Sequence, residues 1–433
     1  MTAADNAGPT LEDELDATLP PGPSMAPTEE TRLSEYSREI EQLTHVAEGF
    51  GLSFHPISFR RASRDNLSLV ASFGLPNRFS HWYFGGIYKN LKIQQDEQLF
   101  SILELVLNTN PVYAFLLDTN THLENLVVIA HVLGHVDFFK NNCWYTRSDQ
   151  NMLNKCELHS RTLRHLGDKF GKEKVDAVIA AALTVCGSVN SFEQNPHFKR
   201  ERLLYFLNEQ LDKRARKVRR SDPAWTDTYL ASRILGMICE ETEYFDLIGR
   251  TQIINEGWAS FIEFKVLEKF LDPSQWLAFS LLFSKRPPPY LIGFTLFDSI
   301  FKQRGWDGVL QVRRSYEDIA FVDQFLTQEL SRRLDLFMLD KESGEKDYDA
   351  RKVKERIIEE KLFKGEPQVR VTDFNPDTLA VTLKHSDEER TLDKKRCELF
   401  LKEVHLLWPN EITLLDNENI YRINQRGFSL ERK

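Results

Sequence analysis

The chain has 433 residues, which exceeds the usual size of one hydrophobic core and predicts two or three structural units. Hydrophobic residues make up 41% and charged residues 28%, and these proportions indicate a globular protein rather than a disordered one. The net charge of -9 argues against nucleic acid as a general partner, because an acidic surface repels phosphate backbones. The five cysteines form no CxxC pair, so we expect free thiols and a cytoplasmic location.

Two further features concern contact with membranes and nucleic acids. No apolar run approaches the roughly 18–20 residues needed to cross a bilayer, and the first residues lack a secretory signal pattern, so no membrane span is expected. The run KRARKVRR at 213–220 has two interpretations, a local basic patch or the solvated end of a helix. The solvated helix end is the more frequent meaning of such a short run.

Residues 1–32 are predicted to form a flexible acidic tail, because prolines and acids there replace the apolar residues that a core needs. From 33 onward the pattern becomes helical, and an amphipathic helix is expected to end at Gly51. Its apolar face consists of Ile40, Leu43, Val46 and Phe50. The chain as a whole is predicted to be mainly α, with a large helical body over 33–338.

An aromatic segment, NRFSHWYFGGIYKNL, occupies 77–91. His81 in this segment is a candidate metal ligand, proton donor or substrate contact, and Trp82 is a candidate substrate contact. A structural imidazole packed on Trp82 is the alternative interpretation.

The segment 110–142 predicts a buried helix. Thr121 and Glu124 form a T-x-x-E capping box, and an almost unbroken apolar run follows them. His131 and His135 are four residues apart, so both project from one helix face and are close enough to bind one metal ion. The alternative is a pair of core histidines satisfied by hydrogen bonds.

Gly134 stands between the two histidines and leaves room for another group to approach the backbone. Because glycine costs a helix interior about 1 kcal/mol relative to alanine, we expect a structural reason for it.

A second polar group lies in the segment 239–261, within a pattern that is helical over about 222–338. Glu240 and Glu243 share one helix face, and Asp246 continues it. Glu256 follows in the next predicted helix among apolar residues, where a carboxylate needs a metal, a cation or hydrogen-bond donors. Arg250 is a cation that could pair with one of these acids instead.

Two histidines on one helix and a glutamate from a later helix match the three-ligand design of helical zinc hydrolases. Those enzymes carry HExxH, but Val132 occupies the position of its glutamate here. The general base must therefore come from elsewhere, and Glu243 or Glu240 is the candidate. The second ring nitrogens of the histidines need acceptors, for which the sequence offers Asp137, Glu240 and Glu243. The candidate substrate contacts are Trp82, Asp137, Asn141, Arg250 and Asn255.

The last part of the chain differs in pattern from the helical body. The segment 339–366 is highly charged and is expected to be an exposed helix or a linker. Residues 367–433 then predict a strand, a second strand, a helix and a third strand, which together form a small α+β domain.

These segments together resemble the SpoVR-like family, named for stage V sporulation protein R. The resemblance covers about residues 35–425 and rests on FSHWYFGGIYKNL, NPVYAFLLDTN, AHVLGHVDFFKNN, ETEYFDLIGRTQIINEGWASF and PYLIG. It implies a link to spore cortex formation, although similar proteins are widespread in bacteria that make no spores. The EGWA element at 256–259 is also similar to a block of helical zinc metallopeptidases, a likeness that implies His131, His135 and Glu256 as ligands.

The leading functional hypothesis is a metal-dependent hydrolase with one divalent ion, preferably zinc, and a peptide or cell-envelope-related substrate. The first alternative is a non-catalytic regulatory or scaffold protein with protein partners in a stress or sporulation pathway and a buried His/Glu network. The second alternative is a non-haem iron or manganese protein, because these metals share the same ligand types.

Overall fold

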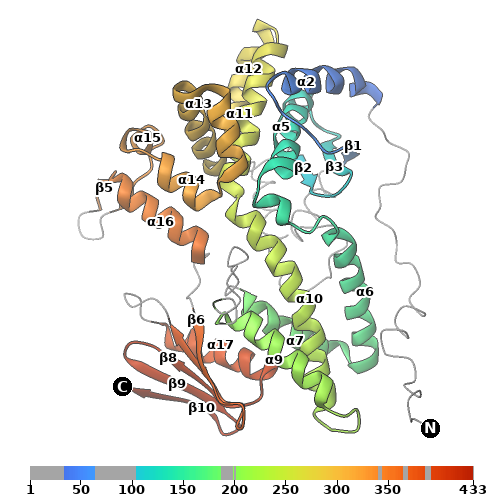
Figure 1. The fold of residues 1–433 in the computed structure, drawn as a ribbon, viewed down its shortest axis with the longest axis vertical. Helices are drawn as coiled ribbons and strands as arrows, with labels where there is room; N and C mark the ends of the chain where they lie inside the picture. The colour runs from blue at the N-terminus through green and yellow to red at the C-terminus, as the bar shows by residue number, and fades with distance from the viewer. Residues whose placement is uncertain are drawn as a thin grey trace, which may run out of the picture.

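The computed structural model describes residues 34–63, 104–186, 198, 201–339, 344–363, 369–385 and 392–432. The protein is mainly helical with a small sheet-containing C-terminal region, which confirms the predicted fold class at this level (Figure 1). The predicted tail and the segment with His81 and Trp82 lie outside the described residues. Within the described part of the chain, every helix is too short or too polar to cross a membrane.

The helices that carry the argument are α2 (Ser37–Gly49), α5 (His122–Asn141), α6 (Met152–Phe170), α7 (Lys172–Thr184), α9 (Leu203–Lys217), α10 (Trp225–Arg250), α11 (Gln252–Phe270), α12 (Pro273–Phe283), α13 (Pro288–Ser315), α14 (Asp318–Phe325), α15 (Gln328–Arg333), α16 (Ala350–Phe363) and α17 (Lys394–Leu407). The strands are β1 (Ile57–Ala62), β2 (Glu104–Leu107), β3 (Val112–Leu117), β4 (Met338–Leu339), β5 (Lys346–Asp347), β6 (Val369–Phe374), β7 (Val381–His385), β8 (Ile412–Leu415), β9 (Asn419–Asn424) and β10 (Gly427–Arg432).

A first hydrophobic core lies around α5, α11 and α13, and α2, α12, α14 and a three-stranded sheet cover it (Figure 1). Its largest fully buried side chains are Trp258, Phe138, Phe261, Phe279, Phe297 and Phe321. The sheet has the order β1-β3-β2, with β1 parallel and β2 antiparallel to β3. This sheet within the helical body was not predicted from the sequence.

Helix α5 begins as predicted. The Thr121 hydroxyl accepts a hydrogen bond from the Glu124 backbone N–H, and the Glu124 carboxylate accepts one from Thr121 N, which completes the capping box. From Asn125 to Phe139 every residue of α5 is buried, so the helix runs through the core rather than along its surface.

Close helix contacts explain the glycines near the predicted site. A Cβ atom on Gly134 would lie 2.5 Å from the Ala259 Cα, so only glycine allows α5 and α11 to cross at this distance. On the other side of α11, a Cβ atom on Gly257 would lie 2.3 Å from the Gly293 Cα of α13. Helix α11 is therefore held at backbone distance from both neighbours.

A second hydrophobic core combines α7, α9, the first half of α10 and the C-terminal sheet. The sheet has the order β10-β9-β8-β7-β6, and α17 packs on it. The predicted strand, strand, helix and strand correspond to β6, β7, α17 and β8, and the structure adds β9 and β10. A backbone hydrogen bond of 2.8 Å from Val371 to Glu201, just ahead of α9, joins the sheet edge to the helices.

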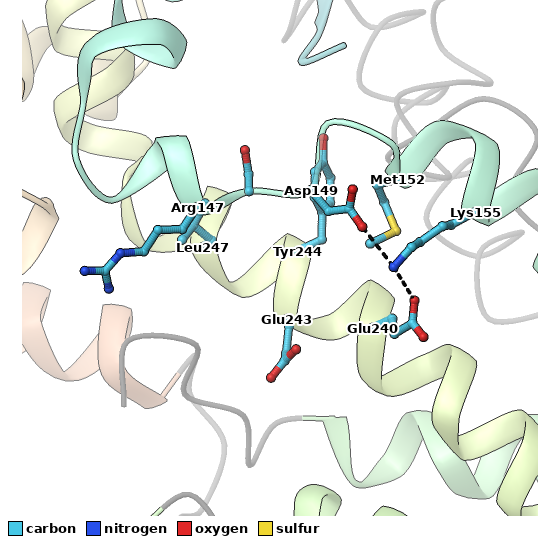
Figure 2. A pocket seen from close by; sticks show the side chains of 9 residues that line it. Arg147, Asp149, Met152, Lys155, Glu240, Glu243, Tyr244 and Leu247 are labelled. Atoms are coloured by element: carbon cyan, nitrogen blue, oxygen red, sulfur yellow. Dashed lines mark hydrogen bonds and ion pairs between the residues drawn. The ribbon is translucent and has the colours of Figure 1, made fainter. Parts of the chain in front are cut away.

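Helix α10 connects the two cores and runs obliquely between them in Figure 1. A small cluster of Leu107, Met152, Cys156 and Tyr244 packs α6 and β2 against the middle of α10. Figure 2 shows this junction, with Met152 and Lys155 of α6 beside Tyr244 and Glu240 of α10.

The charged segment 339–366 contains α16, so the helix interpretation is correct for 350–363. Val353 and Ile357 pack on the first core, and the Lys361 ammonium donates to the Gly249 carbonyl at 3.0 Å. The helix therefore rests on the junction between α10 and α11. The predicted domain boundaries themselves stay a prediction.

Replacing Gly134 with Ala is expected to destabilise the protein by about 1–3 kcal/mol, because the added methyl group would force α5 away from the α11 backbone. Urea unfolding followed by circular dichroism measures the loss. Gly236→Ala is the matched control in the interior of α10, where the nearest atom to a Cβ would be 3.7 Å away. The control should be neutral or stabilising by up to about 1 kcal/mol. Equal unfolding free energies for the two variants would contradict the close-contact argument.

Candidate metal centre

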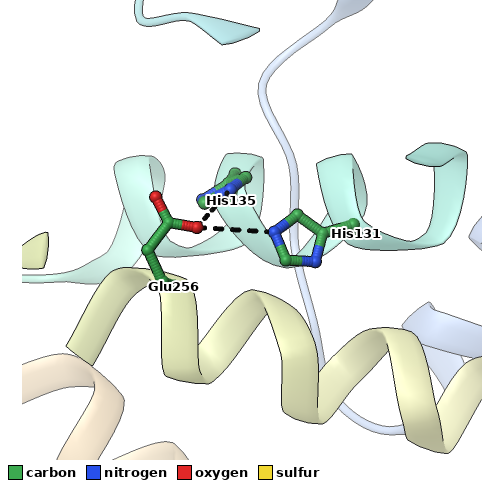
Figure 3. A group of neighbouring side chains, drawn as sticks. All are labelled: His131, His135 and Glu256. Atoms are coloured by element: carbon green, nitrogen blue, oxygen red, sulfur yellow. Dashed lines mark ion pairs between the residues drawn. The ribbon is translucent and has the colours of Figure 1, made fainter. Parts of the chain in front are cut away.

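Two histidines and one glutamate converge between α5 and α11 (Figure 3). Their ligand atoms all lie within 4.8 Å of one another, and the residues are His131, His135 and Glu256. One carboxylate oxygen of Glu256 lies 3.5 Å from the His131 Nε2 and 3.4 Å from the His135 Nε2. Among the described residues, this is the one group of three or more such side chains with metal-site spacing.

The crossing of α5 and α11 produces this convergence. His131, Gly134 and His135 share the face of α5 that meets α11, because they are three and four residues apart. Glu256 precedes Ala259, the residue in contact with Gly134, by three positions, so both lie on one face of α11. The glycine contact therefore places the carboxylate opposite the two imidazoles.

The second ring nitrogens of the histidines have acceptors that the sequence analysis did not select. The His131 Nδ1 lies 2.7 Å from the Glu263 carboxylate, and the His135 Nδ1 lies 3.0 Å from the Asn255 side-chain oxygen. A carboxylate can only accept, so the His131 Nδ1 carries the proton and donates it. The prediction that Asp137, Glu240 or Glu243 would serve as these acceptors is therefore wrong.

These partners decide where the lone pairs of the imidazoles point. With the proton on Nδ1, each neutral ring has its Nε2 lone pair on the side of Glu256. Two lone pairs and a carboxylate oxygen then converge, an arrangement that is repulsive unless a cation lies between them. The Glu256 oxygen in question is buried and has no hydrogen-bond donor among the described residues.

The distances in the group fit metal ligands better than hydrogen bonds. An N–H···O hydrogen bond typically spans about 2.7–3.2 Å, which is shorter than the 3.4 and 3.5 Å observed here. Two ligands at about 2.1 Å from a tetrahedral ion are about 3.4 Å apart. The two separations from Glu256 therefore fit ligands of a tetrahedral divalent ion.

Electrostatics at the site favour ionised carboxylates. Burial would raise the pKa of the Glu256 carboxyl, but positive charge on protonated His135 and His131 imidazoles outweighs burial and holds this pKa well below its usual range, and a cation bound in place of those protons would act in the same direction. Burial is likewise outweighed at Glu263, where the Arg286 guanidinium and His131 lower the carboxyl pKa. Both acids are therefore negatively charged at neutral pH.

Asp137 and Asn141 lie on α5, and their described contacts are with residues other than the two histidines. The Asp137 carboxylate accepts hydrogen bonds from Ser53 N at 2.9 Å and Trp258 Nε1 at 3.0 Å and pairs with Arg313 at 3.1 Å. Burial raises the pKa of Asp137 to about 6 although Arg313 opposes this shift. The Asn141 side chain donates to the Ser53 carbonyl at 3.1 Å. These contacts tie α5, α11, α13 and the loop between α2 and β1 together, and the proposed role of both residues in substrate binding stays a prediction.

Glu240 and Glu243 do not belong to the metal group. They line a hollow of about 230 Å³ between α6 and α10 together with Arg147, Asp149 and Tyr244 (Figure 2). Glu240 is exposed and forms an ion pair of 2.8 Å with Lys155. No described contact links either carboxylate to the histidines, so their assignment as general base stays a prediction.

The remaining candidate residues of α10 and α11 lie in different environments. The Asn255 side-chain oxygen accepts a hydrogen bond from the His135 Nδ1, so this candidate substrate contact has a partner within the protein. Arg250 is buried in the last turn of α10, and Asp246 is buried one turn earlier. Glu241, which was not among the candidates, is fully buried, and its carboxylate lies 2.9 Å from the His159 Nδ1.

Glu263 and Arg286 were not predicted from the sequence. Glu263 lies seven residues after Glu256, which is two helical turns, so the spacing alone could have placed it on the same face of α11. Arg286 lies between α12 and α13 and donates to the Glu263 carboxylate at 2.5 Å. No local pattern connects this arginine to α11, because only the fold brings it there.

A buried aspartate fixes the start of α11. The two Asp318 carboxylate oxygens accept hydrogen bonds from Ile253 N at 3.0 Å and Ile254 N at 2.8 Å. The Lys361 ammonium forms an ion pair with the same carboxylate at 3.0 Å. These bonds satisfy backbone N–H groups that a helix start leaves open, and they anchor the helix that carries Glu256.

Replacing Asp318 with Ala is expected to cost about 3 kcal/mol or more, because it leaves two buried N–H groups and the Lys361 charge without their acceptor. Asp272→Ala is the matched control, since Asp272 also caps a helix but is exposed, and its loss should cost about 1 kcal/mol. Chemical unfolding of both variants gives the comparison. A cost for Asp318→Ala no larger than that of the control would refute the anchoring role.

The sequence matches the family model described as SpoVR like protein at residues 29–229 and 230–365. This match spans most of the chain, so the protein belongs to the SpoVR-like family. The chain is also similar to the uncharacterized protein YcgB of Escherichia coli (strain K12), with 23% identity over 89% of this chain and 92% of that protein. No solved structure matches the chain.

Proposed function

We propose that this chain is a metal-dependent hydrolase that acts on a peptide or a cell-envelope-related substrate. The observation that carries the proposal is the convergence of His131, His135 and Glu256 at distances suited to a tetrahedral ion. The proposed ion is zinc, because two imidazoles and one carboxylate from a helical pair match catalytic zinc sites. The similarity of the EGWA element to helical zinc metallopeptidases supports the same conclusion, and the family name supports a role in sporulation or stress.

The residues of the chain divide the work as follows. His131, His135 and Glu256 would hold the ion, which would act as a Lewis acid for hydrolysis. Glu263 and Asn255 orient the imidazoles through their Nδ1 atoms. Glu256 has 17% of its side chain exposed, more than either histidine of the group.

The general base is the open part of the mechanism. Val132 is fully buried at the position of the HExxH glutamate and cannot activate water. We propose Glu243 for this role, with Glu240 as the alternative, on the basis of their carboxylate chemistry. If neither acts as base, the scaffold alternative gains support, because a metal site without a base can serve structure alone.

Metal analysis provides the first test. Protein purified with metal in the medium should contain about one equivalent of zinc, and His135→Ala should lose the ion together with the thermal stability that it contributes. His159→Ala is the matched control, since His159 is also buried and paired with a glutamate but lies outside the group. It should lose stability yet keep its metal. Iron or manganese in place of zinc would support the non-haem alternative, and wild-type protein without any metal would refute the proposal.

A turnover assay provides the second test. Zinc-loaded protein incubated with peptides derived from the bacterial cell wall should release new amino groups, which fluorescamine detects. Glu243→Gln keeps the shape of the side chain but removes the base, so turnover should fall by about 100-fold or more while the metal content stays unchanged. Unchanged turnover would exclude Glu243 as the base. Absence of turnover in zinc-, iron- and manganese-loaded protein would contradict the hydrolase and favour the scaffold.

A further inference from the structure

A buried carboxylate, Glu263, connects His131 of the histidine pair to the guanidinium of Arg286. Glu263 is fully buried on α11, and one of its carboxylate oxygens contacts both the His131 Nδ1 at 2.7 Å and the Arg286 guanidinium at 2.5 Å. Arg286 also lies over the Tyr290 ring at 5.2 Å, and the Tyr290 ring stacks on the His131 imidazole at 5.7 Å. His131 is therefore held from two sides, by a carboxylate and by an aromatic ring.

We infer that Glu263 is a positioning residue that sets the metal affinity of the site, and that Arg286 is its counter-charge. This inference rests on the proposed metal-dependent function. Glu263 accepts the Nδ1 proton of His131, which holds the ring as the tautomer whose Nε2 lone pair faces Glu256. Its negative charge also makes the imidazole a stronger donor to a cation.

The two histidines differ in this respect. His131 donates to a carboxylate, whereas His135 donates to the neutral side-chain oxygen of Asn255. A charged acceptor raises the basicity of the ligand more than a neutral amide does, so His131 is the stronger of the two nitrogen ligands. Glu263 therefore contributes more to metal affinity than Asn255.

Arg286 stabilises the buried Glu263 carboxylate through an ion pair. The Arg286 guanidinium contacts the same Glu263 oxygen that accepts from the His131 Nδ1, so the carboxylate shares its charge between the two groups. The arginine also places a positive charge near the site, which weakens the binding of a cation. The two residues thus have opposite direct effects on metal affinity.

This opposition defines the experiment. Zinc affinity is measured by competition with a chromophoric chelator for wild type, Glu263→Gln and Arg286→Gln. Glu263→Gln keeps a hydrogen-bond acceptor but removes the charge, so affinity should fall by about 10–100-fold. Arg286→Gln removes a positive charge, so affinity should stay the same or rise. Glu268→Gln is the matched control on the same helix, exposed and 3.7 Å from Lys265, and should leave affinity unchanged within about twofold.

A purely structural role would give a different pattern. Loss of packing would weaken zinc binding in both the Glu263 and the Arg286 variants, and that result would overturn the inference. Unchanged affinity in Glu263→Gln would overturn it as well. Cobalt substitution adds a spectroscopic measurement, because a weaker His131 donor should shift the d–d absorption bands of Glu263→Gln, whereas the Glu268 control should keep the wild-type spectrum.

The failure of the proposed function gives a distinct result. If wild-type protein binds no zinc, the metal proposal fails, and nitrogen NMR of ¹⁵N-histidine-labelled, metal-free protein then tests the positioning role alone. His131 should be a neutral ring with its proton on Nδ1, and a proton on Nε2 would overturn the inference. The same spectrum decides the matter if Glu263→Gln does not fold.

Discussion

The approach of α5 to α11 at Gly134 is the constraint on which the candidate site depends. A Cβ at this position would lie 2.5 Å from the Ala259 Cα, so any other residue would separate the helices. Separation would move Glu256 away from both imidazoles, because the carboxylate lies one turn from Ala259. The Gly257–Gly293 contact on the opposite side and the Asp318 carboxylate at the helix start then prevent α11 from shifting in response. Backbone packing, rather than the ligands themselves, sets the geometry of the site.

Buried charge is distributed so that each ionised group faces a partner. Asp137 pairs with Arg313, Glu263 with Arg286, and Asp318 with Lys361. All three carboxylates contact α11 or belong to it, so this helix is surrounded by paired charges whose separation would be costly in a low-dielectric interior. Glu256 differs from these acids, since its neighbours are imidazoles that face it through Nε2. The exception lies at the position where a cation would complete the set.

Local signals predicted a large part of this arrangement. The capping box at Thr121, the spacing of His131 and His135, and an acid in an apolar context at Glu256 depend only on residues close in sequence, and the fold brings the three candidate ligands together. The acceptors of the second ring nitrogens required tertiary knowledge. Asp137 was a plausible acceptor by sequence, but two residues after His135 it points to the opposite side of the helix, toward Ser53 and Trp258. The sheet β1-β3-β2 was missed because its strands are only four to six residues long, and periodicity over so short an apolar run does not distinguish a strand from a helix.

The positive charge that balances Glu256 could come from protons on the two imidazoles or from a metal ion. The distances between the imidazole nitrogens and the Glu256 oxygen distinguish these two cases. Two protonated imidazoles would compensate Glu256 and give the site the same net charge as a divalent ion would. Each imidazolium would then donate to the carboxylate through a charge-assisted hydrogen bond of about 2.7–2.9 Å. The observed separations, 3.5 Å at His131 and 3.4 Å at His135, both exceed this length. Helices α5 and α11 already pack at backbone distance near Gly134, so the spacing of the helices does not prevent a shorter contact. His135 in addition has only the neutral oxygen of Asn255 at its Nδ1, which offers an imidazolium no second negative charge. Neutral imidazoles around one divalent ion would satisfy both observations, and this supports the proposed metal site over a hydrogen-bonded His/Glu network.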